Sequence, residues 1–334
     1  MVNGMGGSVE PVWRIPATVR ALRPEAAALL DEANRLAWLV VPPRALEPLR
    51  VRQAQLIGND DGLSRTAGGS PGRADEDADA LARLTFAEQF VIDVGGMPEQ
   101  YVADLTRAVG GDALRGFVQA LYVTECTQRL EVMVPMLLGP GAPDADQHDV
   151  RDDAAGAGSS LVHGDPALDP TAALGCVLHD YQDAVVRGRA LDPVVTELVR
   201  LRCARTHDCR ICRTLRLSDA REAGADDAMT AKVDFYERSD LDERTKSALR
   251  VTDTFITRPD TLGEAAVAGA RSAFTPEQLV ELCLDITKWS TQKVHVALGT
   301  DGAERLPLNA QGVSFFGFAD DGSVAGYSAE PLVR

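Results

Sequence analysis

The stretch ELVRLRCARTHDCRICRTLRLSDAREAG, residues 197–224, sets the expected fold of this chain. Its first part continues an apolar stripe that starts just after Asp192-Pro193, a pair typical of the N-cap and first turn of a helix. Gly224 is of the residue type that commonly follows the last turn of a helix. The stretch therefore predicts two consecutive helices, the second of which starts near Asp208 and ends near Gly224.

Segments downstream carry helical patterns too. Residues 241–255 have apolar side chains at helical spacing, and TPEQ (275–278) is a capping box that opens a pattern continuing to Leu298. Aromatic residues are only 5% of the chain, whereas alanine and leucine abound, which favours an all-α protein. Near the C-terminus, alternating apolar residues flank Asp320-Asp321-Gly322 and predict a short β-hairpin.

Four blocks of sequence recur in the same order. EANRL (32–36) is answered by ELVRL (197–201), LRVRQAQLIGND (49–60) by LRLSDAREAGAD (215–226), ALARLTFAEQFV (80–91) by TKSALRVTDTFI (245–256), and TQRLEVMV (127–134) by TQKVHVAL (291–298). The offsets lie between 164 and 166. The chain is therefore predicted to be a tandem duplication of a helical unit. In this register Glu32 matches Glu197, Arg50 matches Arg216, and the close cysteine pair has no counterpart.

The expected domain organisation follows from the repeat. Residues 1–20 are predicted to be a flexible N-terminus, 21–140 a helical repeat without the cysteine pair, and 171–300 a helical domain that contains it. The stretch 141–170 is acidic and rich in glycine, alanine and proline, so it is predicted to link the repeats. Residues 301–334 form a tail with the hairpin.

Charge and hydropathy limit the partners of the chain. It has 34 basic and 50 acidic residues, a formal net charge of −16. Such a surface repels phosphate backbones and anionic lipids, so neither nucleic acid nor membrane is an expected partner. There is no apolar run of membrane-spanning length and no signal-peptide pattern near Met1. These features predict a cytoplasmic protein.

Cys209 and Cys212 form a CxxC pair, whereas the other four cysteines are isolated in apolar patterns. If a helix starts near Asp208, both thiols lie on one face of its first turn, where the positive helix terminus stabilises a thiolate. A thiolate attacks a peroxide or a disulfide, and a neighbouring thiol resolves the product. From the pair alone, a redox site, two structural thiols and half of a zinc site all remain open. Zinc would need further ligands such as His207 or His179.

The stretch 197–224, together with FTPEQLVELCLDI (274–286), resembles the AhpD-like family, which includes alkylhydroperoxidases and carboxymuconolactone decarboxylases. The family core has a glutamate on one helix, a CxxC pair twelve residues later, and a histidine four residues beyond the pair. The resemblance covers about residues 170–300, and residues 25–140 only through the repeat. It implies two AhpD-like helical repeats, a homo-oligomer, and peroxide or thiol–disulfide chemistry that needs no metal or other cofactor.

Carried over to this chain, the resemblance makes Cys212 the attacking thiolate, Cys209 the resolving thiol and Glu197 the acid–base member of a proton relay. The family histidine falls on Arg216, which stays protonated and so cannot shuttle a proton. His207 is a candidate replacement that also fits an exposed loop. His179 and His295 are candidates for acid–base or substrate-binding roles that also fit structural ones.

The sequence thus favours a thiol-dependent peroxidase or thiol–disulfide oxidoreductase, with a hydroperoxide or small metabolite as substrate and a thiol reductant as partner. One alternative is a non-redox enzyme of the carboxymuconolactone decarboxylase type, in which Arg216 anchors a small carboxylated metabolite. The other is an oligomeric binding protein without catalytic activity.

Overall fold

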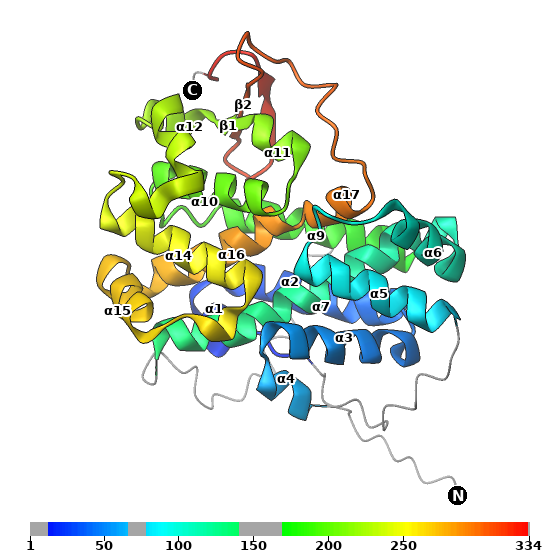
Figure 1. Cartoon of the computed structure of the whole chain (residues 1–334). Coiled ribbons are helices and arrows are strands. Elements are labelled where there is room, and N and C mark those ends of the chain that lie inside the picture. Colours follow the sequence, from blue (N-terminus) through cyan, green and yellow to red (C-terminus); the bar gives the residue numbers. More distant parts are fainter. Residues whose placement is uncertain (1–12, 66–77, 140–168, 333–334) are drawn as a thin grey trace, which may run out of the picture.

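The computed structural model describes residues 13–65, 78–139 and 169–332, and they are mostly helical (Figure 1). The expected linker 141–170 and N-terminus fall largely outside these residues. The helices before the linker are α1 Ala17–Leu22, α2 Pro24–Val40, α3 Pro43–Ile57, α4 Asp60–Ser64, α5 Ala78–Ile92, α6 Glu99–Val109 and α7 Gly111–Leu138. Those after it are α9 Pro170–Val186, α10 Pro193–Thr206, α11 Arg210–Thr214, α12 Ser218–Glu222, α13 Asp227–Ala231, α14 Glu243–Thr257, α15 Glu264–Ala273, α16 Pro276–Ser290 and α17 Lys293–Ala297, with 3₁₀ helices η1 Lys232–Arg238 and η2 Pro259–Thr261.

The predicted start signals of two helices are confirmed. Asp192 caps α10 by accepting a hydrogen bond from the Val195 N–H, and Pro193 is its first residue. Thr275 and Gln278 form the reciprocal capping box at the start of α16. Because each cap satisfies amides that have no partner within the helix, these local signals position both helices.

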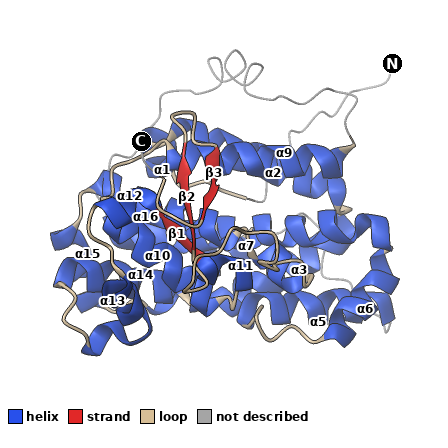
Figure 2. Cartoon of the chain, turned by 90° about the horizontal axis from the view of Figure 1, so that it is seen from above, coloured by secondary structure: helices blue, strands red, loops and turns tan. Residues whose placement is uncertain are grey.

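The tail forms the predicted hairpin and also recruits a third strand. β2 (Ser314–Phe318) pairs antiparallel with β3 (Val324–Ser328), and β1 (Leu215–Leu217) pairs parallel with β2. The sheet stands at one end of the molecule above α10, and Figure 2 shows the same strands from above. The fold is therefore a helical protein with a small three-stranded sheet.

Three predicted boundaries are wrong. The helix that carries Cys212 ends at Thr214 rather than near Gly224, because the next residues form β1 and hydrogen-bond to the tail. The helix from Pro276 ends at Ser290, and α17 is a separate short helix. Residues 17–20 are not a flexible terminus: they belong to α1, whose Val19 is completely buried.

The helices before and after the linker follow a matching order. α3, α5 and α6 gather on one side of the molecule and α10, α14 and α15 on the other (Figures 1 and 2). Between them α2 packs against α7 and α9, and α7 packs against α16. Buried apolar residues of these four central helices form one continuous cluster. Tyr122 of α7 reinforces it by donating a 2.8 Å hydrogen bond to the Thr287 carbonyl of α16.

The offset between matching helices changes along the chain. α5, α6 and α7 begin 165 residues before α14, α15 and α16, but α3 begins only 150 residues before α10. The difference arises because residues 215–242, which hold β1, α12, α13 and η1, stand where the first half has only residues 65–77. A constant offset near 165 is therefore wrong for the helices around the cysteine pair.

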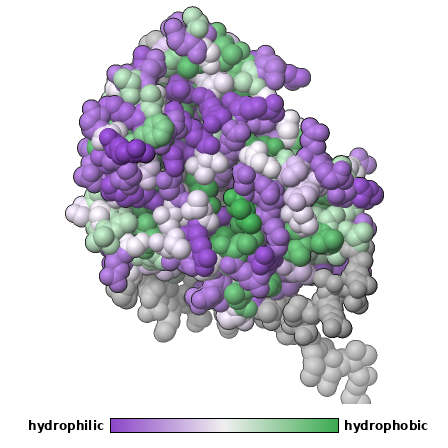
Figure 3. Space-filling view, in the orientation of Figure 1, coloured by the Kyte–Doolittle hydropathy of each residue, from purple (hydrophilic) through white to green (hydrophobic). Residues whose placement is uncertain are grey.

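The described residues contain no helix that is long and apolar enough to cross a membrane. On the face shown in Figure 3 the surface is largely hydrophilic, and apolar surface gathers over α5, where Leu81 and Ile92 are exposed.

Candidate functional site

Cys209 and Cys212 lie at the start of α11 and are joined by a disulfide. Cys209 is the N-cap residue, and its sulfur accepts a 3.3 Å hydrogen bond from the Cys212 N–H. Asp208, just before the pair, has a left-handed backbone with φ of 54° that turns the chain from α10 into α11. Cys209 is 1% exposed, whereas Cys212 is partly exposed. An incoming molecule can therefore reach Cys212 more easily than Cys209.

Arg200 holds α11 against α10. Its guanidinium donates to the Cys212 carbonyl at 2.9 Å and to the Leu215 carbonyl at 2.5 Å. It also donates to both carboxylate oxygens of Glu197, at 2.6 and 2.8 Å. Glu197 and Arg200 are 1% and 2% exposed. Both oxygens of Glu197 are thus hydrogen-bonded to a guanidinium. This arrangement suits a glutamate that orients Arg200 rather than one that exchanges protons with a thiol.

The same contacts occur in the first half, around a short helix, α4, that carries no cysteine. Arg50 of α3 donates to both oxygens of Glu47, at 2.9 and 2.8 Å. It also donates to the carbonyls of Gly62 and Arg65, twelve and fifteen residues further along, as Cys212 and Leu215 are from Arg200. The ion pair and its carbonyl contacts are therefore a feature of the fold.

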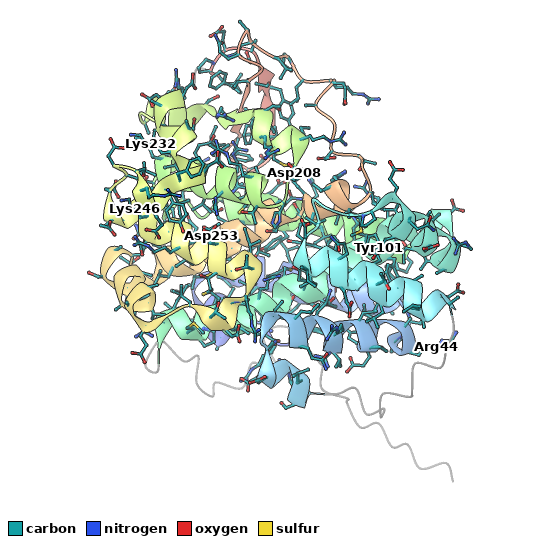
Figure 4. The ribbon with its side chains drawn as sticks, viewed as in Figure 1. Arg44, Tyr101, Asp208, Lys232, Lys246 and Asp253 are labelled. Carbon is teal, nitrogen blue, oxygen red and sulfur yellow. A yellow bond between two sulfur atoms is a disulfide. The ribbon has the colours of Figure 1, made fainter. Side chains whose placement is uncertain are left out.

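These contacts correct the register that the sequence blocks indicate. Arg50 corresponds to Arg200 and not to Arg216, and the counterpart of Glu197 is Glu47 rather than Glu32. With an offset of 165 residues, Arg44 would be the counterpart of Cys209. Figure 4 shows that Arg44 lies far from Asp208, the residue just before Cys209.

In the corrected register Asn59 and Gly62 occupy the places of the two cysteines. Asn59 caps α4 and accepts a hydrogen bond from the Gly62 N–H, as Cys209 does from Cys212. Gly58, with φ of 74°, takes the left-handed place of Asp208.

Asp301, in the tail, binds the start of α11 and was not among the residues that the sequence suggested. Its carboxylate accepts from the Arg210 N–H at 2.8 Å and from the Arg210 side chain at 2.6 and 3.0 Å, and its carbonyl accepts from the Ile211 N–H. Burial acts to raise the pKa of Asp301, but the hydrogen bonds from Arg210 outweigh it and the pKa is lowered. The charged tail residue therefore fastens the helix that carries the cysteines.

Arg216 lies on β1 and has unused hydrogen-bonding capacity. It donates to the carbonyls of Arg213 and Leu215, each at 2.8 Å, while its buried Nε has no partner. In the part of the chain that the structure describes, no carboxylate forms an ion pair with it. Burial lowers the pKa of Arg216, and the nearby charge of Arg200 adds to this effect. Such a guanidinium can accept an anionic partner.

His207 is buried, so the exposed loop position that the sequence also allowed is wrong. Its surroundings differ from those of the cysteine pair. Its Nε2 is 3.0 Å from Ser290 Oγ, and it borders a cavity of about 10 Å³, enough for about one water molecule, beside Glu125 and Lys293. Burial and the charges of Lys293 and Arg129 hold its pKa well below the ordinary value, so it stays neutral.

The other two histidines are also apart from the pair. His179 is exposed, with Nε2 3.8 Å from an Asp183 carboxylate oxygen, and His295 Nδ1 is 3.0 Å from Thr300 Oγ1. Burial and Arg115 lower the pKa of His295. Among the described residues, no histidine is hydrogen-bonded to either cysteine of the pair.

Aromatic side chains cover Arg200 on the side of the sheet. Its guanidinium carbon is 5.9 Å from the ring centre of Trp289 and 5.5 Å from that of Phe316, and both rings contact Phe318. The tail thus encloses the site from two sides, with Asp301 at the start of α11 and with phenylalanines over Arg200. Over residues 13–65, 78–139 and 169–332, no group of three or more His, Cys, Asp or Glu side chains is arranged to hold a metal ion.

The fold and site define a helical protein whose CxxC disulfide is held between an internal arginine and a C-terminal tail. Two Mycobacterium tuberculosis proteins are similar to it: Uncharacterized protein Rv2313c and Uncharacterized protein MT2376, from different strains. Each is 34% identical over 239 residues, which cover 70% of this chain and 79% of the relative. The chain belongs to the family of these mycobacterial proteins. No family model matches the sequence, and no solved structure matches it.

Proposed function

We propose that the protein is a thiol-dependent peroxidase or thiol–disulfide oxidoreductase of the AhpD-like type, which cycles Cys209 and Cys212 between dithiol and disulfide. The observation that carries this proposal is the disulfide across the first turn of α11, which joins one buried and one partly exposed cysteine. A pair that closes within a single turn needs no large movement to form or open its bond. The resemblance that motivates the peroxidase assignment rests on the sequence.

The reaction takes two electrons from the pair. The Cys212 thiolate attacks one oxygen of the hydroperoxide, the O–O bond breaks, and the alcohol leaves after taking a proton. The Cys212 sulfenic acid is then attacked by the Cys209 thiol, water leaves, and the disulfide forms. A thiol reductant, the partner in this proposal, reopens the bond by thiol–disulfide exchange.

Arg200 and Glu197 take positioning roles in this proposal. Arg200 binds the Cys212 carbonyl, and Glu197 holds Arg200 in place. This assignment replaces the proton relay that the resemblance gives Glu197, because Arg200 occupies both of its oxygens and because Glu47 makes the same contacts beside a short helix without a cysteine pair.

We also propose that the two halves are AhpD-like repeats that arose by duplication. The order of their helices and the matched contacts of Arg50 and Arg200 support this origin. In this proposal the first repeat serves as a scaffold, since Asn59 and Gly62 stand in the positions of the cysteines. Assembly into a homo-oligomer and a cytoplasmic location belong to the same proposal and rest on the sequence.

Fully reduced protein treated with one equivalent of cumene hydroperoxide tests the function. We expect rapid loss of two hydrogens, mapped by peptide mass spectrometry to a Cys209–Cys212 bridge. Cys209→Ser should stop at a sulfenic acid on Cys212 that dimedone traps, and Cys212→Ser should not react. If both thiols stay reduced in the wild-type protein, the peroxidase proposal fails.

A second candidate is the non-redox enzyme acting on a small carboxylated metabolite. The buried Nε of Arg216, which has no partner, favours it. Its test is binding of small carboxylates such as benzoate by calorimetry to wild-type protein, Arg216→Met and Cys209→Ser/Cys212→Ser. Binding that is lost only with Arg216 would support this candidate. If there is neither carboxylate binding nor thiol oxidation, the non-catalytic binding protein is the remaining alternative.

A further inference from the structure

The tail binds the residues that the disulfide encloses. The buried carboxylate of Asp301 accepts a hydrogen bond from the Arg210 N–H at 2.8 Å, and the Asp301 carbonyl accepts one from the Ile211 N–H at 2.9 Å. The Arg210 side chain also donates to the Gly299 carbonyl at 3.3 Å. Arg210 and Ile211 are the two residues between the cysteines. We call residues 299–318, from these contacts to the end of β2, the strap.

The strap continues along the chain that follows the pair. Its last part, β2, pairs in parallel with β1, which comes directly after α11. Phe316 of β2 is buried, and its ring centre is 6.4 Å from that of Trp289. Figure 1 shows the chain running from α17 past α11 to the sheet. The hairpin turn beyond the strap is held separately, because Arg187 of α9 donates a hydrogen bond to the Asp321 carbonyl.

The short helix α11 depends on contacts from outside itself. It has only five residues, too few to be stable alone in water. Arg200, the disulfide and the strap hold it in place. The disulfide and the strap restrain the same two residues, Arg210 and Ile211. Ordering these residues costs backbone entropy, so the restraint that is already present lowers the cost of forming the other. The two restraints therefore stabilise each other.

The first half has neither of these two restraints on its short helix. α7 and α16 begin 165 residues apart, but α7 continues as one helix where the second half turns, after Ser290, into α17 and the strap. With this offset the counterpart of Asp301 is Met136, which lies inside α7. The short helix α4 has Asn59 and Gly62 in place of the cysteines. Among the described residues, such a strap therefore occurs only beside the short helix that has the disulfide.

We propose that the strap is coupled to the redox state of the pair: it holds α11 while the disulfide is closed and loosens when the disulfide opens. In the opening step a thiol reductant gives up two electrons and two protons, the S–S bond breaks, and the reductant leaves as a disulfide. Because coupling between two sites is reciprocal, release of the strap also makes the disulfide easier to reduce. Asp301 is the positioning residue of this coupling. The inference rests on the proposed opening and closing of the pair, but not on a hydroperoxide as its oxidant.

Hydrogen–deuterium exchange of the full-length chain tests the coupling by comparing the oxidised wild type with Cys209→Ser/Cys212→Ser, in which the pair is permanently open. We expect backbone amides of the strap to exchange at least about fivefold faster in the open form, the lower end of typical coupling between two sites. The start of α16, capped by Thr275, should not change. The hairpin turn should change less than the strap, because Arg187 holds it separately. Equal exchange of the strap in both forms would overturn the proposal.

The reciprocal measurement is the ratio of reduced to oxidised dithiothreitol at which half of the pair is open, read by thiol alkylation and mass spectrometry. Asp301→Ala should lower this ratio at least about fivefold. Asp320→Ala, which removes an exposed carboxylate from the same tail, should leave it unchanged. Asp301→Asn keeps the size of the side chain and should lower the ratio too, so it replaces the alanine variant if that does not fold.

A merely structural role of Asp301 would lower the stability of its variants without moving the ratio, and that result would contradict the coupling. Neither measurement uses a hydroperoxide. A failed peroxidase reaction therefore leaves both readouts intact, and the two proposals can fail separately.

Discussion

The segments α3–α4 and α10–α11 have the same arrangement of a buried arginine, its glutamate and the short helix that the arginine binds. We call this arrangement the frame, and the two frames differ in the residues that stand at the start of the short helix. In both, an arginine paired with a glutamate binds one carbonyl within the short helix that follows and one just after that helix. The first frame holds Asn59 and Gly62, and the second holds Cys209 and Cys212. The buried ion pair therefore builds the turn in both segments, and the thiols are an addition to it in the second.

The surroundings of the two short helices differ as well. α4 has Asp60 and Asp61 in its first turn, whereas α11 has Arg210 in its first turn and Arg213 in its last. Positive charge near a thiol favours the thiolate, and negative charge disfavours it. Asp301 and Asp208 pair with these two arginines and balance their charges. The difference that remains is the pair of acidic residues in the first turn of α4, which has no equivalent in the first turn of α11. The frame around the cysteines therefore disfavours a thiolate less than its counterpart.

The largest effect is expected when the ion pair of either frame is broken. Arg200→Met leaves the Glu197 carboxylate buried without a partner and should cost about 3–5 kcal/mol of unfolding free energy. Arg50→Met should cost less, because the Glu47 side chain is 16% exposed against 1% for Glu197. Urea unfolding of both variants measures the difference. Equal and small losses would contradict a structural role for the pair.

Exchanging the residues that the frames hold should have a smaller effect. Cys209→Asn/Cys212→Gly copies the first half and should keep the fold, while it loses the disulfide contribution of about 2 kcal/mol for so short a loop. Circular dichroism and urea unfolding under oxidising conditions check this. A variant that does not fold would show that the second frame depends on its cysteines.

The reverse exchange should create a second disulfide. A Cβ built on Gly62 would lie 2.8 Å from Asn59 Cγ, so the two side chains face each other. Asn59→Cys/Gly62→Cys should therefore form a bridge on oxidation, detected by non-reduced peptide mapping. Two free thiols at these positions after oxidation would show that the frames are not equivalent.

Removing the tail carboxylate tests a contact that only the second frame has. Asp301→Ala should cost about 1–3 kcal/mol, since it leaves the backbone amide and the guanidinium of Arg210 without their partner. The lowered pKa of Asp301 makes its contribution fully present above the unfolded value of about 4 and lost as the pH falls through the folded value. The unfolding free energies of the wild type and of this variant should therefore become equal only in acid. A constant difference down to pH 2 would contradict this linkage.

The smallest effect concerns a cap that the frames do not share. Asp192 caps α10 with its side chain, whereas Pro42 before α3 makes no such hydrogen bond. Asp192→Ala should cost about 1 kcal/mol. A shift in the urea midpoint measures it, and Arg44→Ala near the start of α3 serves as a control that removes no cap.

The sequence predicted those features whose signals are local. Asp192-Pro193 and TPEQ at 275–278 identified two helix starts, and the turn around Asp320 identified the hairpin. The correspondence between α3–α4 and α10–α11 was missed, because the longer connection after α11 shifts the matching helices by fifteen residues. The pattern E-x-x-R-x-R-x-A, shared by residues 47–54 and 197–204, is the signal that could have shown it.

Contacts between distant parts of the chain were beyond local patterns. Asp301 lies 91 residues from Arg210, and β1 pairs with a strand about 100 residues away. The sequence near the cysteines therefore holds no signal that predicts their contact with the tail. The burial of His207 likewise depends on which helices pack around it. Such contacts follow from the packing of helices, whereas caps and turns follow from a few neighbouring residues.

The most direct test of the account places both pairs in one molecule. Asn59→Cys/Gly62→Cys retains Cys209 and Cys212, and the fully reduced variant is given less than one equivalent of cumene hydroperoxide. We expect the Cys209–Cys212 bridge to form at least about tenfold faster than the transplanted one, because two acidic residues stand in the first turn of α4 and none in that of α11. Equal rates, or faster closure of the transplanted pair, would contradict the claim that the second frame is built for thiol chemistry.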